Sequence, residues 1–531
     1  MHEKNDSGTS AGKPVRVLVL VDELWGANIN IDEGKPNILA QLLSFGWELT
    51  LVSPLPDPKP CPVAAPYPKP AAFEAIVPAR SIADAGAYDG LLVLPGRTHV
   101  NLLRDPDCLR LVREARTAKL AAAAFCRGVR VFAAAGILDG ATVTGHPDFE
   151  KEYLAAGARY IGYKDLKSKS DAPPPVVDGI IVTALRSNYY RAETCEAVRI
   201  AVENSRRVRG FAGQGSGGMA RNNKAGKASE PAFAIYADSE ELKSALLCVL
   251  SIRAFGERAA KAPVAVLTEG GADSVPSTLL ASFERQGCSV LDFSLPESLR
   301  NYTYCAKAAA AARAEAWAKD SGADELVWMD ADTLILREPS EIMLNPEFIA
   351  GGRPVHHLLI GSEAGAPLDA FWRSVLDATG IDEALLFPLR TTIDRVDARF
   401  YPNAGFLAVR PEAGILSAWK DSLLRFVDDE AVQAAVTTAP HRIFFHQAVL
   451  ACVLAKTAGP SGFMEFSFGY NFPLHLAERC PATLKPGKLD DLYTLRYDAW
   501  NNLPGDDSAW NGIAIPPRVK EWLGSALANI G

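Results

Sequence analysis

The chain has 531 residues, of which 48% are hydrophobic and 22% charged, so it is long enough for two globular domains of roughly 200–300 residues each. Its formal net charge of -8 excludes a domain-wide basic field and argues against nucleic-acid binding. The nine cysteines include no CxxC pair, and no apolar stretch is long enough to span a bilayer. We therefore predict a cytoplasmic protein with reduced thiols and with neither a nucleic-acid nor a membrane partner.

The first half of the chain alternates strand and helix signals after a polar segment, 1–14, that is predicted to be a disordered tail. Strands are expected at residues 15–21, 49–52, 90–94 and 120–125, helices at 37–45, 105–118, 129–135 and 192–203, and a hairpin at 176–183. Strands that alternate with helices imply a mostly parallel sheet covered on both faces.

A segment rich in arginine, lysine, glycine and serine, 204–230, separates the two halves and is interpreted as a flexible basic linker. A second α/β pattern follows it. Strands are expected there at residues 233–236, 264–267 and 325–330, and helices at 240–255 and 304–319. The fold class is therefore α/β, in two domains that span 15–203 and 231–531.

Cys126 follows the apolar strand predicted at 121–125 and precedes Arg127, Gly128 and the start of a helix. Such a sharp strand-to-helix turn lifts a side chain above the sheet, near free backbone N–H groups that favour a thiolate. The alternative is a buried structural cysteine, because free cysteines are commonly buried.

The residues around Cys126, with the segment that ends at His146-Pro147, resemble the ThiJ/PfpI family of the class I glutamine-amidotransferase-like superfamily. In its protein deglycase/glyoxalase branch a histidine follows the nucleophilic cysteine by twenty positions and precedes a proline, as His146 does here. The resemblance covers residues 15–203 and implies a flavodoxin-like α/β sandwich that could form a homodimer. It also implies that Cys126 is the nucleophile and that Gly96 supplies a backbone amide to an oxyanion hole.

The family places an acidic residue beside its cysteine. Glu33 is our first choice for that residue, with Asp32 and Glu23 as alternatives. Two positions depart from the family, because Arg127 replaces a common histidine and Arg97 replaces a second glycine. The resemblance implies hydrolase- or lyase-like attack on a small electrophile such as an α-oxoaldehyde.

Asp330 and Asp332 follow each other two residues apart at the end of the buried-looking strand 325–330. Residues two apart on an extended chain face the same side, so these carboxylates suit a hard divalent cation that bridges to phosphate oxygens. Short acidic turns are common, but apolar flanks on both sides are unusual for a solvated turn. The pattern predicts a domain that handles a nucleotide diphosphate.

The two aspartates, together with Asn403-Ala-Gly405 and His446-Gln447, resemble the glycogenin-like glycosyltransferases of family 8. The resemblance covers about 232–500 and implies a GT-A, Rossmann-like nucleotide-diphospho-sugar transferase domain that uses a nucleotide sugar as donor. It implies that Asp330 and Asp332 bind Mn²⁺ or Mg²⁺.

The same resemblance assigns four residues to substrate. Asn403, Gly405 and Gln447 would contact the sugar or the acceptor, and Arg313 falls where relatives have a lysine near the donor phosphates. The late histidine that serves relatives as a third metal ligand is missing, and His475 and Asp498 are candidate substitutes.

Both domains together predict a bifunctional enzyme. The alternative is a non-catalytic sugar-nucleotide-binding or redox-sensing protein that retains both folds. An amidotransferase that feeds ammonia to its neighbour is disfavoured, because the usual arrangement of triad histidine and acid is lost.

Overall fold

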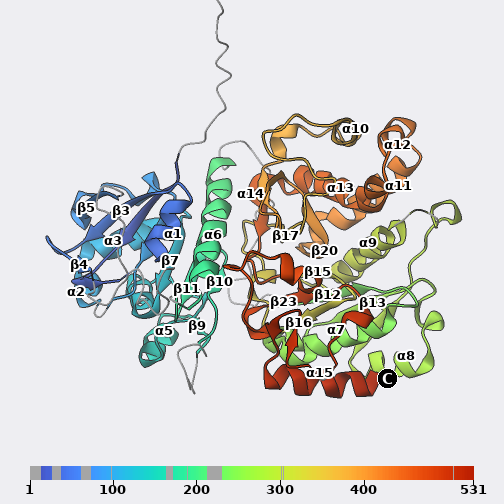
Figure 1. Cartoon of the computed structure of the whole chain (residues 1–531), viewed down its shortest axis with the longest axis horizontal. Coiled ribbons are helices and arrows are strands. Elements are labelled where there is room, and N and C mark those ends of the chain that lie inside the picture. The colour runs from blue at the N-terminus through green and yellow to red at the C-terminus, as the bar shows by residue number, and fades with distance from the viewer. Residues whose placement is uncertain are drawn as a thin grey trace, which may run out of the picture. The chain divides into compact units, whose positions relative to one another are not determined.

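The computed structural model describes residues 14–26, 37–60, 73–96, 99–162, 172–187, 189–211, 230–300, 302, 304–505 and 507–530 (Figure 1). The chain divides into two units, Met1–Arg206 and Arg207–Gly531, and each has its own seven-stranded sheet. The predicted α/β class is confirmed in both units. No helix in the described ranges is long and apolar enough to cross a membrane.

The N-terminal unit is built on a sheet with strand order β10-β11-β7-β6-β1-β3-β5, parallel except for β10. Its strands are β1 (Arg16–Leu20), β3 (Glu48–Ser53), β5 (Phe73–Pro78), β6 (Gly90–Val93), β7 (Ala121–Phe125), β10 (Val176–Asp178) and β11 (Ile181–Ala184). Its helices are α1 (Ile38–Ser44), α2 (Val100–Arg104), α3 (Pro106–Thr117), α4 (Val129–Ala135), α5 (Glu150–Ala155) and α6 (Arg191–Phe211).

Side-chain alternation along β1 fills two separate cores in this unit. Val17 and Val19 pack in the cluster that includes residues of α1 and α6, whereas Leu18 and Leu20 pack in the cluster with residues of α3 and α4. A strand with both faces apolar is what a sheet covered on both sides requires. The expected parallel sheet with helices on both faces is therefore confirmed.

The helix expected at 192–203 is longer than predicted, because α6 continues to Phe211. The first residues of the predicted linker are thus helical, and its remainder up to 229 lies outside the described residues, as do residues 1–13 of the predicted tail. The predicted hairpin is confirmed, since β10 and β11 pair antiparallel around Gly179, which has a φ of 60°.

The C-terminal unit has a sheet of order β14-β13-β12-β15-β20-β17-β21, in which β20 runs antiparallel to both of its neighbours. Its strands are β12 (Pro231–Tyr236), β13 (Val264–Leu267), β14 (Cys288–Leu291), β15 (Glu325–Asp330), β17 (Ala350–Pro354), β20 (Pro402–Val409) and β21 (Phe463–Glu465). A smaller sheet joins β16 (Thr333–Ile335), β23 (Thr494–Arg496) and β22 (Phe472–Pro473).

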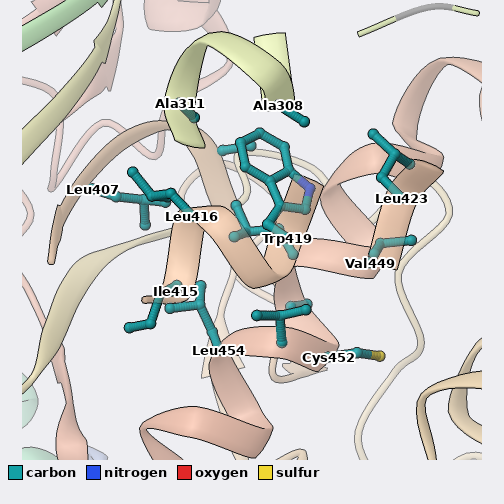
Figure 2. Close-up of a cluster of buried hydrophobic side chains, with 14 of the residues drawn as sticks. Ala308, Ala311, Leu407, Ile415, Leu416, Trp419, Leu423, Val449, Cys452 and Leu454 are labelled. Carbon is teal, nitrogen blue, oxygen red and sulfur yellow. The ribbon is translucent and has the colours of Figure 1, made fainter. Parts of the chain in front are cut away.

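The main helices of this unit are α7 (Leu242–Phe255), α8 (Ser277–Arg285), α9 (Cys305–Asp320), α10 (Ala370–Thr379), α11 (Ile415–Val427), α12 (Glu430–Ala435), α13 (Ala439–Thr457), α14 (Gly459–Gly462) and α15 (Pro517–Ile530). Alanines on α9 let α11 approach closely. Figure 2 shows the Trp419 ring of α11 facing Ala308 and Ala311 of α9. Buried Glu315 of α9 accepts the backbone N–H groups of Leu416 and Ser417 at 2.9 Å each, so α9 is fixed against the first turn of α11.

Candidate functional sites

Cys126 lies directly after β7, in a turn of 3₁₀ helix that leads into α4. Its φ of 55° is unusual for a residue with a side chain and is typical of strained positions at functional sites. The turn needs glycine two residues later, because a Cβ on Gly128 would lie 3.0 Å from the Val93 carbonyl oxygen. The predicted sharp strand-to-helix turn is therefore present, and Cys126 as a whole residue is partly exposed.

His146 lies beside Cys126 through the backbone. Its N–H donates to the Cys126 carbonyl oxygen at 3.3 Å. The imidazole Nδ1 lies 3.4 Å from the Asp148 carboxylate, and the ring packs against Phe149. Within the described ranges, no hydrogen bond joins the His146 ring to the Cys126 thiol.

Burial of the Cys126 thiol outweighs the positive groups around it. Burial raises the pKa of Cys126 above its ordinary value, although the Arg127 backbone N–H and the charges of Arg186 and Arg127 oppose that rise. The neutral thiol therefore dominates at pH 7. Glu33 and Asp32 lie outside the described residues, and Glu23 is exposed.

Gly96 lies where the loop after β6 meets the loop after β1. It forms an isolated β-bridge with Trp25, and Gly26 donates to the Pro95 carbonyl at 2.8 Å. The neighbouring position 97 lies outside the described residues. The structure thus places Gly96 on a fixed backbone, and its oxyanion role stays a prediction.

The C-terminal unit has a cavity of about 460 Å³ at the end of β15. Four of the predicted site residues line it: Asp330, Asn403, Gly405 and Gln447. Asp332 follows on the same turn and is 7% exposed. Ligands in α/β proteins commonly bind at the carboxyl ends of parallel strands, which is where Asp330 lies.

Side-chain oxygens accept hydrogen bonds from the backbone at the start of β20, next to Asp330. Gln447 of α13 accepts the Ala404 N–H at 2.9 Å, and Asn403 accepts the Gly405 N–H at 2.8 Å. A Cβ on Gly405 would collide with the Asp330 carboxylate. Glycine is therefore required at 405 for the strand to pass this close to the aspartate.

Two cationic side chains face the paired aspartates. Lys307, in the first turn of α9, forms an ion pair with Asp330 Oδ1. Arg496 of β23 places Nε 2.8 and 3.1 Å from the two Asp332 oxygens and Nη2 3.3 Å from Asp330 Oδ2. All four carboxylate oxygens thus have a positively charged neighbour.

These charges change the ionisation of the acids. Burial would raise the pKa of Asp330, but Lys307 and Arg496 outweigh it and hold that pKa below its ordinary value. Burial raises the pKa of Asp332, whereas the Arg496 guanidinium opposes the rise. Burial, with the charge of Asp238, raises the pKa of Glu241, which also lines the cavity, to about 7.

Four histidines also line the cavity: His356, His357, His446 and His475. His356 is 8% exposed, and neither of its ring nitrogens has a hydrogen-bond partner among the described residues. The rings of His356 and His475 lie 6.5 Å apart, and His357 also borders the cavity. His446 stacks on Tyr304 at 4.1 Å, and burial lowers its pKa to about 3, so it is neutral near pH 7.

Two family models match the chain in separate segments. Residues 42–193 match the DJ-1/PfpI family, and residues 233–458 match a Rhodobacterales glycosyltransferase domain. The chain joins a DJ-1/PfpI domain to a glycosyltransferase domain. The resemblance to the ThiJ/PfpI family is confirmed, and the second resemblance is confirmed as far as a glycosyltransferase domain.

Solved structures similar to the chain include ThiJ/PfpI and DJ-1 proteins. The ThiJ/PfpI domain protein from Brachyspira murdochii is 17% identical over 35% of this chain and 95% of that one, with a TM-score of 0.27. DJ-1beta from Drosophila melanogaster is 16% identical over 36% and 96%, with a TM-score of 0.26. A two-domain protein from Anabaena variabilis with DJ-1/ThiJ/PfpI-like and ferritin-like domains is 17% identical over 51% and 69%, with a TM-score of 0.28. A comparison with curated proteins gives no match.

The aspartates of the glycosyltransferase domain fit a divalent cation poorly. Mg²⁺ and Mn²⁺ require several oxygen or nitrogen ligands, but Lys307 and Arg496 occupy the oxygens of both carboxylates. Among the described residues, no three histidine, cysteine or acidic side chains are grouped to hold a metal. His475 and Asp498 border the cavity without completing such a group. The expected Mn²⁺ or Mg²⁺ stays a prediction that this donor set disfavours.

Arg313 does not join the other predicted substrate-binding residues. It is exposed on α9 and does not line the cavity. Six residues are about one and two-thirds turns of helix, so Arg313 and Lys307 lie on different faces. Lys307 is the basic residue of α9 that reaches the aspartates, and the sequence comparison with relatives missed it.

The reactivity of Cys126 gives a test of the DJ-1/PfpI domain. Because its thiol pKa is raised, iodoacetamide will alkylate Cys126 at pH 7 more slowly than it alkylates free cysteine. The rate will keep rising above pH ~8.5, the ordinary cysteine pKa. Mass spectrometry of the Cys126 peptide measures this rate, with Cys126→Ser as the control. Alkylation at pH 7 that is faster than for free cysteine would contradict the described electrostatics.

Proposed function

We propose that the glycosyltransferase domain transfers a sugar from a nucleoside diphosphate sugar to an acceptor, as a family 8-like enzyme. The observation that carries this proposal is the cavity of about 460 Å³ at the end of β15, where Asp330, Asn403 and Gln447 converge. Its volume is in the range of small-molecule sites, and its polar lining suits a ligand with phosphates and hydroxyls.

The side chains have distinct roles in this proposal. Asn403 and Gln447 fix the backbone at the start of β20, next to Asp330. A fixed backbone there would hold the donor sugar and the acceptor in the orientation that the reaction needs. His356 offers two ring nitrogens without partners in the described part of the chain, and sugar hydroxyls would satisfy them. The neutral His446 adds no charge near the donor.

Calorimetry of the full chain with UDP-, GDP-, ADP- and dTDP-sugars tests the proposal. We expect saturable binding of donors that carry one of these bases, and competition by the matching nucleoside diphosphate. The nucleoside alone will compete weakly, because most of the affinity is expected at the diphosphate. If none of these nucleotide sugars binds, the proposal is wrong.

The strained turn at Cys126 favours a second activity in the DJ-1/PfpI domain. We propose that its thiol attacks a small electrophile such as an α-oxoaldehyde, with Cys126 as nucleophile and His146 beside it. Consumption of methylglyoxal by the wild type and by Cys126→Ser measures this. An equal rate in both proteins would favour the alternative of a non-catalytic, redox-sensing domain.

A further inference from the structure

We infer that Lys307 and Arg496 bind the diphosphate of the donor and stabilise the leaving group in place of a divalent cation. The inference rests on the proposed glycosyltransferase function. It starts from the observation that Asp330 and Asp332 already form ion pairs with Lys307 and Arg496. A metal ion bound to the same carboxylate oxygens would have to displace these side chains.

The backbone of the small sheet places Arg496 beside the aspartates. Thr333, the residue after Asp332, pairs with Arg496 in the antiparallel register of β16 and β23. Tyr497 then donates its N–H to the Asp332 carbonyl oxygen at 3.1 Å. A residue held by a strand ladder on both sides cannot easily leave, so the guanidinium is a fixed part of the site.

The positive charge of Lys307 and Arg496 equals the charge that a divalent cation would supply to the leaving diphosphate. Lys307 and Arg496 together supply two positive charges, the same as one divalent cation, against the two carboxylates. Their side chains are 8% and 26% exposed, so these charges act with little screening by water. Cationic side chains that hold transferring phosphoryl groups are an established alternative to metal ions.

Both side chains keep donors for a phosphate. Lys307 has three N–H donors and one carboxylate partner, Asp330. Arg496 uses Nε and Nη2 on the aspartates, and its Nη1 has no hydrogen-bond partner among the described residues. A planar guanidinium in this position can bind an aspartate and a phosphate at the same time.

Sugar transfer from the donor to the acceptor balances with these residues and the two substrates. The bond between the anomeric carbon and the diphosphate oxygen breaks, and its electron pair remains on the diphosphate. The acceptor oxygen bonds to the anomeric carbon, and its proton passes to the departing phosphate oxygen. Lys307 and Arg496 face the phosphate where negative charge develops, which is where stabilisation lowers the barrier.

Calorimetry with UDP, GDP, ADP and dTDP as probes, in EDTA and separately with MnCl₂, tests this inference on the full chain. We expect one of these diphosphates to bind in EDTA, with affinity that Mn²⁺ changes little. Lys307→Gln and Arg496→Gln will each weaken binding roughly 10–100-fold, the size of a lost charge-assisted hydrogen bond. Lys307→Arg and Arg496→Lys keep the charge and will bind more tightly than the glutamine variants.

Matched controls are Lys243→Gln and Arg285→Gln, which remove exposed charges outside the cavity and will bind as the wild type does. Thermal unfolding of each variant separates lost folding from lost binding. Diphosphate binding that requires Mn²⁺, or that is unchanged in both Lys307→Gln and Arg496→Gln, overturns the inference. Either result is still compatible with the proposed function. No binding of any diphosphate or nucleotide sugar in either condition overturns both.

Discussion

Gly405→Ala will reduce nucleoside diphosphate sugar binding by about fivefold or more, because overpacking of this kind typically costs 1–3 kcal/mol. The added methyl would collide with the Asp330 carboxylate and lie 3.0 Å from Asn403 Oδ1. Asp330 cannot rotate away freely, since Lys307 and Arg496 hold both of its oxygens. Calorimetry with the preferred donor measures the change.

The matched control for this substitution is Gly524→Ala on α15. A Cβ there meets no atom within 4 Å, and the residue is exposed. Alanine in a helix is favoured over glycine by about 1 kcal/mol, so this variant will bind donor normally and be slightly more stable. Equal donor binding by Gly405→Ala and the wild type would show that the geometry at Asp330 does not govern binding.

Arg353→Met will destabilise the glycosyltransferase domain by about 3–5 kcal/mol, because it leaves a buried carboxylate without its partner charge. Arg353 of β17 donates to Glu465 at 3.1 Å and to the Phe466 carbonyl at 2.8 Å, and the two charged side chains are 1% and 0% exposed. Chemical denaturation followed by tryptophan fluorescence measures the loss.

Replacing both charged residues tests the cause. The double variant Arg353→Met/Glu465→Met removes the unpaired charge, so it will recover much of the stability lost in the single variant. Arg390→Met, which breaks a partly exposed ion pair with Asp397, will have a much smaller effect. A single Arg353→Met variant as stable as Arg390→Met would contradict this account of the core.

Local patterns in the sequence predicted most of the fold. The apolar run at β1, the helix α4 closed by Gly136, and the strand β15 that ends on Asp330 all follow from signals within a few residues. Such signals are local, so they can be read without knowing what packs against them. The end of α6 could not be predicted this way, because its arginines also fit a linker.

The composition of the glycosyltransferase cavity was only partly predictable. Asp330 and Gln447 belong to recognisable motifs, but Arg496 reaches the aspartates through strand pairing between segments that lie far apart in the chain. The contact of Lys307 with Asp330 depends on where α9 begins and how the helix packs, because these decide which of its residues face the cavity. One signal was present in the sequence, since Arg496 lies in the segment where relatives carry their metal-binding histidine.

Release of nucleoside diphosphate from the same sugar donors tests the central claim most directly. The full chain is incubated with each donor in turn, and water replaces the unknown acceptor in a slow hydrolysis. We predict release from donors of one base by the wild type, and strongly reduced release by Gly405→Ala with Gly524→Ala unchanged. No release from any donor, or equal release by all three proteins, would contradict the claim that the cavity beside Asp330 is a glycosyltransferase site.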